Sequence, residues 1–170
     1  AIFDADKLSW VNEQYIQTTM PEDLAKQLEP HLIKLGVLEQ GHGLSLQEIA
    51  KVVPCLKNRA KTLVEMAEKS AFFFNKQVKF DEKAKNKFLA NDSKALLEKV
   101  IMGLTGLDDF SAENIESLFK KIVEKEGLKL GKLAQPVRVA LTGTTVSPGI
   151  YDVILLLGKE ESLKRLKEVV

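Results

Sequence analysis

Apolar side chains recur every three or four residues along most of this chain, which is the spacing of one face of an α-helix. The spacing holds at Leu8, Val11, Tyr15 and Ile16, at Leu24, Leu28, Leu32 and Leu35, and at Ile115, Leu118, Phe119, Ile122 and Val123. Pro21 suits the first turn of the second of these helices, and Gly36 ends it. The pattern predicts an all-α fold without a sheet of three or more strands.

Capping residues indicate where further helices begin. Ser45 with Glu48 three residues later is a capping box before a short helix. Predicted N-caps also stand at Asp81, Asp92 and Ser111, and Gly127 ends the helix that Ser111 opens. Near the end of the chain, Ser147 as N-cap and Pro148 as the first helical residue open a helix from Ile150 to Leu157. Gly158 ends that helix, and residues 159–170 form the last one.

One segment fits either a strand or a helix. Val137, Val139 and Leu141 alternate with Arg138 and Ala140, as in a strand, but a lone strand has no partner in this sequence, so we expect a helix. Pro54 restarts the chain into a predicted helix that runs to about Lys69. Its buried stripe consists of Leu56, Ala60, Leu63, Met66 and Ala67.

The polar stretch from Asn75 to Asp81 is the expected boundary between two helical subdomains. We expect the first subdomain to comprise residues 1–78 and the second residues 79–170.

Composition narrows the function only slightly. The 170 residues are 45% hydrophobic and 29% charged, with a net charge of +1, so a nucleic-acid partner would need a local basic patch. The single cysteine, Cys55, excludes an internal disulfide and suits a reducing cytoplasm, where we expect the protein. No apolar run approaches membrane-spanning length, and the first residues resemble a cut inside a longer protein rather than a signal peptide.

Catalytic and metal-binding chemistry has little support. His31 and His42 are the only histidines and have no second ligand at metal spacing, so His42 is interpreted as a loop residue. Cys55 follows Pro54 in apolar surroundings and is expected to be packed rather than reactive. Phosphate-binding glycine motifs and the nucleophile-elbow motif are absent. We therefore predict neither a catalytic nor a metal site.

The three arginines, Arg59, Arg138 and Arg165, are more informative, because a guanidinium is a planar fork that suits bases and phosphates. Arg59 falls within the apolar stripe of its predicted helix. It is therefore either a buried or snorkelling structural residue, or a rigidly held guanidinium that points at a ligand. The aromatic residues Phe72, Phe73, Phe74, Trp10 and Tyr15 are expected in the core, although exposed rings would suit base stacking.

Four blocks of the chain resemble the C-terminal part of bacterial glutamyl-tRNA synthetases. They are residues 7–16 (KLSWVNEQYI), residues 58–67 with Phe72 to Phe74, Phe80-Asp81 with residues 107–118, and residues 131–151 (GKLAQPVRVALTGTTVSPGIY). The last block is the most specific, although Ser147 and Tyr151 stand where some members have threonine and phenylalanine.

This resemblance implies two helical subdomains of the class I synthetase anticodon-binding type. It implies that Arg59 reads the third anticodon base and that Arg138 and the turn Ser147-Pro148-Gly149-Ile150 contact the first two bases. The partner is then the tRNA for glutamate, bound by a monomer, with discrimination against glutamine tRNA. The HIGH-like and KMSKS-like signatures that activate glutamate with ATP are absent, so the fragment binds no cofactor and is expected to be inactive alone.

Two other interpretations remain. One is a helical adaptor or scaffold that binds protein through a groove and has no RNA partner. The other is a complete small enzyme, which the missing chemistry disfavours. If the chain is an anticodon-binding domain, Arg59 should be accessible to solvent and lie on the same face as residues 147–150.

Overall fold

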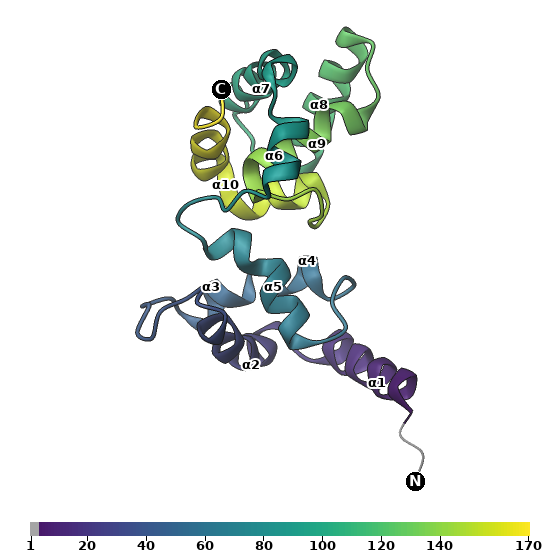
Figure 1. Ribbon diagram of the computed structural model, residues 1–170, viewed down its shortest axis with the longest axis vertical. Helices are drawn as coiled ribbons and strands as arrows, with labels where there is room; N and C mark the ends of the chain where they lie inside the picture. Colours follow the sequence, from purple (N-terminus) through teal and green to yellow (C-terminus); the bar gives the residue numbers. More distant parts are fainter. Residues whose placement is uncertain (1–3) are drawn as a thin grey trace. The chain divides into compact units, whose positions relative to one another are not determined.

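The computed structural model describes the backbone of residues 4–170 and their side chains except that of residue 91. Within this range the chain forms ten α-helices and no strand, which confirms the predicted all-α fold (Figure 1). The chain divides into two compact units, Ala1–Asn75 and Lys76–Val170. Each unit has its own apolar core, so each is described by itself.

Helix α2 is the centre of the first unit, where it packs against α3, α4 and α5 (Figure 1). The bounds are α1 Ala5–Thr18, α2 Pro21–Lys34, α3 Leu46–Ala50, α4 Val53–Leu56 and α5 Leu63–Phe74. Leu24, Leu28 and Leu32 of α2 are fully buried, as are Ile49 and Met66 on the facing helices. The expected start at Pro21 and the capping box of Ser45 and Glu48 are both confirmed.

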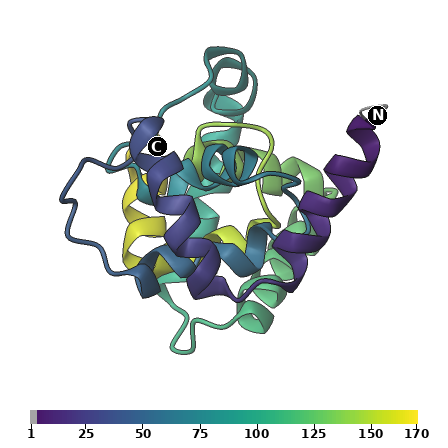
Figure 2. The ribbon, with the colours of Figure 1, turned by 90° about the horizontal axis from the view of Figure 1, so that it is seen from below.

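Helix α1 extends away from the other helices of the first unit (Figure 2). Ile16 is its one buried residue, whereas Trp10 is 60% and Tyr15 47% exposed. The prediction that Trp10 and Tyr15 belong to the core is therefore wrong. Leu8 and Val11, which share the predicted apolar face, are exposed as well, so within the described residues only the last turn of α1 reaches the core of its unit.

Helix α9 forms the core of the second unit and packs against the four other helices there. The bounds are α6 Glu82–Phe88, α7 Asn91–Thr105, α8 Ala112–Glu126, α9 Leu130–Thr142 and α10 Ile150–Lys167. Val137, Val139 and Leu141 are all fully buried, and so is Ala140 between them. This segment is helical, as predicted. Its strand-like alternation arises because α9 is covered on several sides rather than along one stripe.

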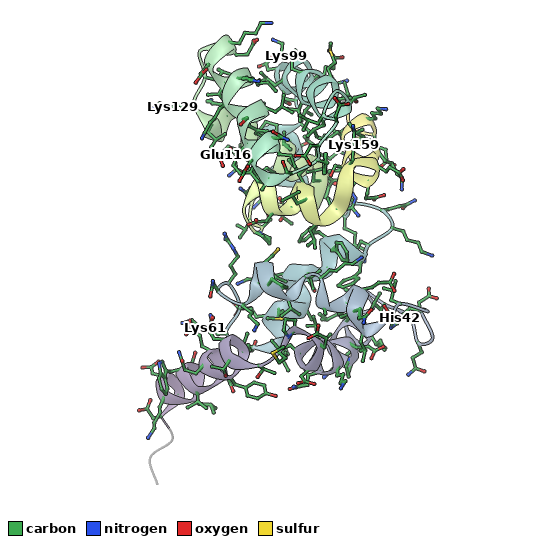
Figure 3. All side chains as sticks on the ribbon, turned by 180° about the vertical axis from the view of Figure 1, so that it is seen from behind. His42, Lys61, Lys99, Glu116, Lys129 and Lys159 are labelled. Carbon is green, nitrogen blue, oxygen red and sulfur yellow. The ribbon has the colours of Figure 1, made fainter. Side chains whose placement is uncertain are left out.

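Helix α10 is interrupted at Gly158, as predicted, since this residue has φ 78° and ψ 169° inside an otherwise helical segment. Lys159, the next residue, donates from Nζ to the carbonyl oxygens of Thr105 at 2.9 Å and Leu107 at 2.7 Å (Figure 3). These bonds satisfy carbonyl groups at the C-terminal end of α7, where no helical partner follows. The interruption therefore allows one lysine to join α10 to the end of α7.

Arg165 has a structural role. Its side chain is 3% exposed, and its Nε donates to Glu161 Oε1 at 2.7 Å while Nη1 donates to the Leu141 carbonyl at 2.8 Å. A buried charge needs such partners, because desolvation otherwise costs several kcal/mol (about 3–5 when one partner is removed). Arg165 thus joins the last part of α10 to the end of α9.

Most predicted caps of the earlier helices are present, but the one predicted at Asp92 is misplaced. Asp81 and Ser111 accept hydrogen bonds from the backbone N–H groups three residues later, and Gly127 ends α8 in the left-handed region. Asp92, however, lies inside the first turn of α7, whose N-cap is Ala90. An acidic residue is favourable in the whole first turn because it faces the positive helix end, so its presence does not by itself locate the cap.

Candidate functional site

Arg59 lies in a loop, not on a helix. Residues 57–62 separate α4 from α5, so the predicted continuous helix from Pro54 to about Lys69 is wrong. The Arg59 N–H donates to the Leu56 carbonyl at 2.8 Å and closes a turn. Thr62 then caps α5 by accepting from the Glu65 N–H at 3.1 Å. The Thr62-x-x-Glu65 spacing is a helix-start signal in the sequence and would have placed Arg59 outside the helix.

The side chain of Arg59 is exposed, whereas its neighbour Ala60 is 2% exposed. No carboxylate among the described residues forms an ion pair with Arg59 within 4 Å. The buried structural alternative for Arg59 is therefore wrong, and the expected accessibility to solvent is confirmed. An exposed guanidinium on a loop is available to a ligand.

The Arg59 loop is held by two residues of α5. Lys69 Nζ donates to the Arg59 carbonyl and, at 3.0 Å, to Glu65 Oε1. The other Glu65 oxygen accepts from the backbone N–H of Lys61, a residue of the same loop, at 2.7 Å (Figure 3). These bonds lower the pKa of Glu65, with the Lys61 N–H as the largest cause and Lys69 as the second. The main chain on both sides of Ala60 is thus fastened to α5.

We expect Glu65→Gln to loosen this loop. Because the pKa of Glu65 is lowered by folding, the carboxylate stabilises the loop above its unfolded pKa of about 4.3 and loses this effect as the pH falls through the folded value. The measurement is the hydrogen-exchange protection of the Lys61 amide as a function of pH. In wild type the Lys61 amide should lose protection as the pH falls. In Glu65→Gln it should be less protected already at neutral pH, and its protection should not change further on acidification.

The matched control is Glu68→Gln, since Glu68 is an exposed residue of the same helix. It should leave the protection of Lys61 unchanged. Equal protection in wild type and Glu65→Gln at neutral pH would show that the carboxylate does not hold the loop.

In the second unit, Arg138 is bound to the turn that precedes α10. Its Nη1 donates to Ser147 Oγ at 2.6 Å, to the Pro148 carbonyl at 2.9 Å and to the Ser147 carbonyl at 3.3 Å. Arg138 is half-buried on α9, so the guanidinium connects the body of that helix to residues 147 and 148. The structure thus brings together three of the six predicted site residues and gives Arg138 a positioning role.

Ser147 does not cap α10, contrary to the prediction. The N-cap is Gly149, without a side-chain hydrogen bond, and the helix begins at Ile150. The Ser147 hydroxyl is engaged elsewhere, because it donates to the Pro148 carbonyl at 2.8 Å and accepts from Arg138. Pro148 and Ile150 are buried, so the surface of this turn consists mainly of Ser147 and Gly149.

Gly149 has little space for a side chain. A Cβ added there would lie 2.8 Å from Oδ2 of Asp152, an acidic residue in the first turn of α10. The carboxylate lies beside the positive helix end, where it is stabilised. This end of α10 therefore has a negative charge of its own, which disfavours a phosphate and favours groups that donate hydrogen bonds.

Tyr151 follows the turn and stacks edge-on against Phe119, with ring centroids 5.5 Å apart. Burial raises the pKa of the Tyr151 phenol, and Glu116 raises it further. Since folding disfavours the phenolate, stability should fall as the pH rises from about 10, the unfolded value, through the folded pKa.

The chain has two tyrosines, so Tyr15→Phe leaves Tyr151 as the single phenol. We expect an absorbance titration of this variant to give a midpoint above about 10, and Glu116→Gln to lower it. A Tyr151 midpoint at or below about 10 would contradict the expected effect of burial.

His42 is a structural loop residue, as interpreted from the sequence. Its Nε2 lies 3.0 Å from Glu29 Oε1, and its Nδ1 accepts from the Leu44 N–H at 3.0 Å. Within residues 4–170, no three histidine, cysteine, aspartate or glutamate residues are grouped so that they could hold a metal ion. No helix in the same range is long and apolar enough to cross a membrane.

The first unit thus has an exposed arginine on a fastened loop, and the second has an arginine that holds a Ser-Pro-Gly turn. A family model described as the anticodon binding domain matches residues 23–170. The chain therefore belongs to the anticodon-binding domain family.

Relatives of this chain are glutamate–tRNA ligases. The chain is 42% identical to the ligase of Thermodesulfovibrio yellowstonii over 170 residues, which is 100% of this chain and 37% of that protein. It is 43% identical to the ligase of Syntrophobacter fumaroxidans over 166 residues, 98% of this chain and 35% of that protein. The crystal structure of a glutamate tRNA ligase from Elizabethkingia meningosepticum matches with a TM-score of 0.80 and 28% identity, covering 98% of this chain and 32% of that one. The chain thus spans about a third of the length of these relatives.

Proposed function

We propose that this chain binds the anticodon loop of the tRNA for glutamate and reads its three anticodon bases. Membership of the anticodon-binding family carries this proposal, and the similarity to glutamate–tRNA ligases over nearly the whole chain supports it. The exposed side chain of Arg59 on a held loop agrees with it, because single-stranded bases are read by side chains that reach their pairing edges.

Arg59 reads the third base. Glutamate anticodons end in cytosine, whose pairing edge presents two acceptors to a guanidinium. Glutamine anticodons end in guanine, whose edge presents mainly donors, and these would face the N–H groups of Arg59. One such charged contact is worth about 1–3 kcal/mol of discrimination. Arg59 thereby favours glutamate tRNA over glutamine tRNA.

The turn in the second unit contacts the other two bases. Because the side chains of Pro148 and Ile150 are buried, the groups available there are the main chain and Ser147. Arg138 acts through its bonds to Ser147 and Pro148 and keeps those groups in place. The nearby carboxylate of Asp152 favours the donor groups of bases over phosphates at this helix end.

The longer protein would attach glutamate to its tRNA with ATP, and this chain would supply recognition alone. The nucleotide-binding signatures for glutamate activation are absent from the sequence. We therefore expect no ATP–pyrophosphate exchange with glutamate and tRNA above background in a preparation free of contaminating synthetase.

The deciding experiment is a fluorescence titration of the chain with anticodon stem-loops. Binding should be sensitive to salt, since Lys and Arg release counterions from RNA, and it should depend on all three anticodon bases. Stem-loops with each base changed in turn measure that dependence at one salt concentration. Salt-sensitive binding that is indifferent to the triplet, or no binding at all, would contradict the proposal; the latter would favour a protein-binding adaptor.

A further inference from the structure

The second unit has a pocket that includes none of the six predicted site residues. It has a volume of about 350 Å³ and lies between α6, α9 and the loop that connects α9 to α10. Its walls are Asp81, Lys83, Ala84, Lys87, Phe88, Gln135 and Thr145. The volume falls within the range of about 300–1,000 Å³ that is typical of sites for small molecules. A group the size of a nucleotide therefore fits.

One wall of the pocket is basic. Lys83 and Lys87 are exposed and lie four residues apart on α6, so their side chains share one face of the helix. Lys87 Nζ lies 5.2 Å from the centre of the Phe88 ring. The acidic member, Asp81, is engaged as the N-cap of α6, where Oδ1 accepts from the Ala84 N–H at 2.7 Å. The two ammonium groups thus suit a phosphate.

A polar group stands on another wall. Gln135 Oε1 is buried and has no hydrogen-bond partner among the described residues. A buried acceptor without a partner is unfavourable, so a ligand that pairs with this amide removes that cost. The amide also carries two donor hydrogens, and its oxygen and nitrogen exchange places on rotation. An amide of this kind matches the edge of a nucleobase, which presents donors and acceptors side by side.

The pocket adjoins the turn that is proposed to contact the anticodon. Thr145 precedes Ser147 by two residues in the same loop, and Gln135 precedes Arg138 by three residues, or about one helical turn, on α9. An RNA strand on the turn would therefore continue toward the pocket.

We propose that this pocket binds one nucleotide of the tRNA anticodon loop outside the three anticodon bases. This inference rests on the proposed function. Lys83 and Lys87 contact the phosphate, the Gln135 amide contacts the edge of the base, and the Phe88 ring forms an apolar wall. The domain then recognises a loop nucleotide in addition to the triplet.

The test combines base removal with one substitution. A series of anticodon stem-loops, each with one abasic nucleotide in the loop outside the triplet, is titrated against wild type and Gln135→Met. Removal of the base at one position should lower the affinity for wild type roughly tenfold, the size of one base contact. The same removal should not lower the affinity for Gln135→Met any further. Gln135→Met itself should weaken the intact stem-loop by a similar factor.

A lysine pair provides the second measurement. Lys83→Ala with Lys87→Ala should weaken every stem-loop and reduce the slope of log affinity against log salt by about one, because both lysines contact the same phosphate. The matched control is Lys121→Ala with Lys125→Ala, an exposed pair with the same spacing on α8. This control should leave the affinity and the salt slope nearly unchanged. Far-UV circular dichroism verifies that both pairs remain folded.

The outcomes separate the two proposals. If wild type fails to distinguish anticodon triplets, the proposed function is wrong. If wild type reads the triplet but binds every abasic stem-loop equally well, the pocket holds no base and the inference is overturned. Equal losses from the two lysine pairs also overturn it, because the effect would then be one of general charge.

Discussion

Arg59→Gln is expected to reduce the ratio of two affinities by roughly 5- to 150-fold. The two are the affinity for a stem-loop whose third anticodon base is cytosine and the affinity for one whose third base is guanine. This range corresponds to about 1–3 kcal/mol, the size of one specific base contact. Glutamine has both a donor and an acceptor, so it satisfies either edge, whereas arginine has donors only and a charge that strengthens the cytosine contact. Paired titrations of both stem-loops at one salt concentration measure the change.

Lys61→Gln is the matched control, because Lys61 is exposed in the same loop and its backbone bond to Glu65 does not involve its side chain. This variant should weaken both stem-loops by the same factor and lower the salt slope. If Arg59→Gln behaves in the same way, Arg59 is a charge contact and does not read the base. A lower melting temperature with unchanged affinities would mean that Arg59 only supports the fold.

Gly143→Ala is expected to destabilise the second unit by about 2–5 kcal/mol. Gly143 has φ 80°, where a side chain costs about 1–2 kcal/mol, and an added Cβ would overlap the backbone carbonyl of Lys79. Relieving such an overlap costs typically about 1–3 kcal/mol more. The change would also disturb the bond at 2.9 Å from the Asp81 N–H to the Gly143 carbonyl. Urea denaturation followed by circular dichroism measures the loss.

Gly127→Ala separates the two contributions. Gly127 has φ 62° at the end of α8, but nothing lies within 4 Å of a Cβ added there. This substitution should lower the free energy of unfolding by only about 1–2 kcal/mol, the cost of a side chain in the left-handed region. If the two alanine variants lose the same stability, the contact with Lys79 is not tight and α6 is not seated against the end of α9 as described.

Local signals in the sequence were sufficient for most of the fold. The capping box at Ser45 and the caps at Asp81, Ser111 and Gly127 depend on bonds within one helical turn, so they are readable without tertiary structure. The periodicity of α9 was harder to interpret, because a helix buried on several sides has no single apolar stripe. What settled it was the absence of any strand partner.

Tertiary contacts determine what the sequence did not predict. Trp10 is a large apolar residue and is expected in the core for that reason, yet it is 60% exposed in the described part of the chain. Ser147 has the local signature of an N-cap, but Arg138, nine residues earlier, takes its hydroxyl. The pocket around Gln135 is lined by residues of α6 and α9, which are far apart in the sequence, so no local sequence pattern predicts it.

The family resemblance correctly predicts that Arg59 is accessible to solvent. The prediction that Arg59 lies on a helix is wrong. The segments before and after residues 57–62 both favour a helix, so the sequence pattern does not show the loop between them. Thr62 and Glu65 nevertheless mark the true start of α5. A polar residue in an apolar stripe, followed by a residue with N-cap chemistry such as Thr62, is better interpreted as a break between helices.

The fastening of the Arg59 loop at both ends has a consequence for the thermodynamics of RNA binding. At its beginning, Lys57 Nζ donates to the carbonyls of Gln17 at 3.2 Å and Thr19 at 2.6 Å, and Gln17 Nε2 donates back to the Lys57 carbonyl at 3.0 Å. At its end, Glu65 and Lys69 hold the loop main chain. The backbone of the loop is therefore ordered without RNA. In the proposed complex, the Arg59 side chain would be the main part of this loop that binding has to immobilise, at an entropic cost of about 0.5–1.5 kcal/mol.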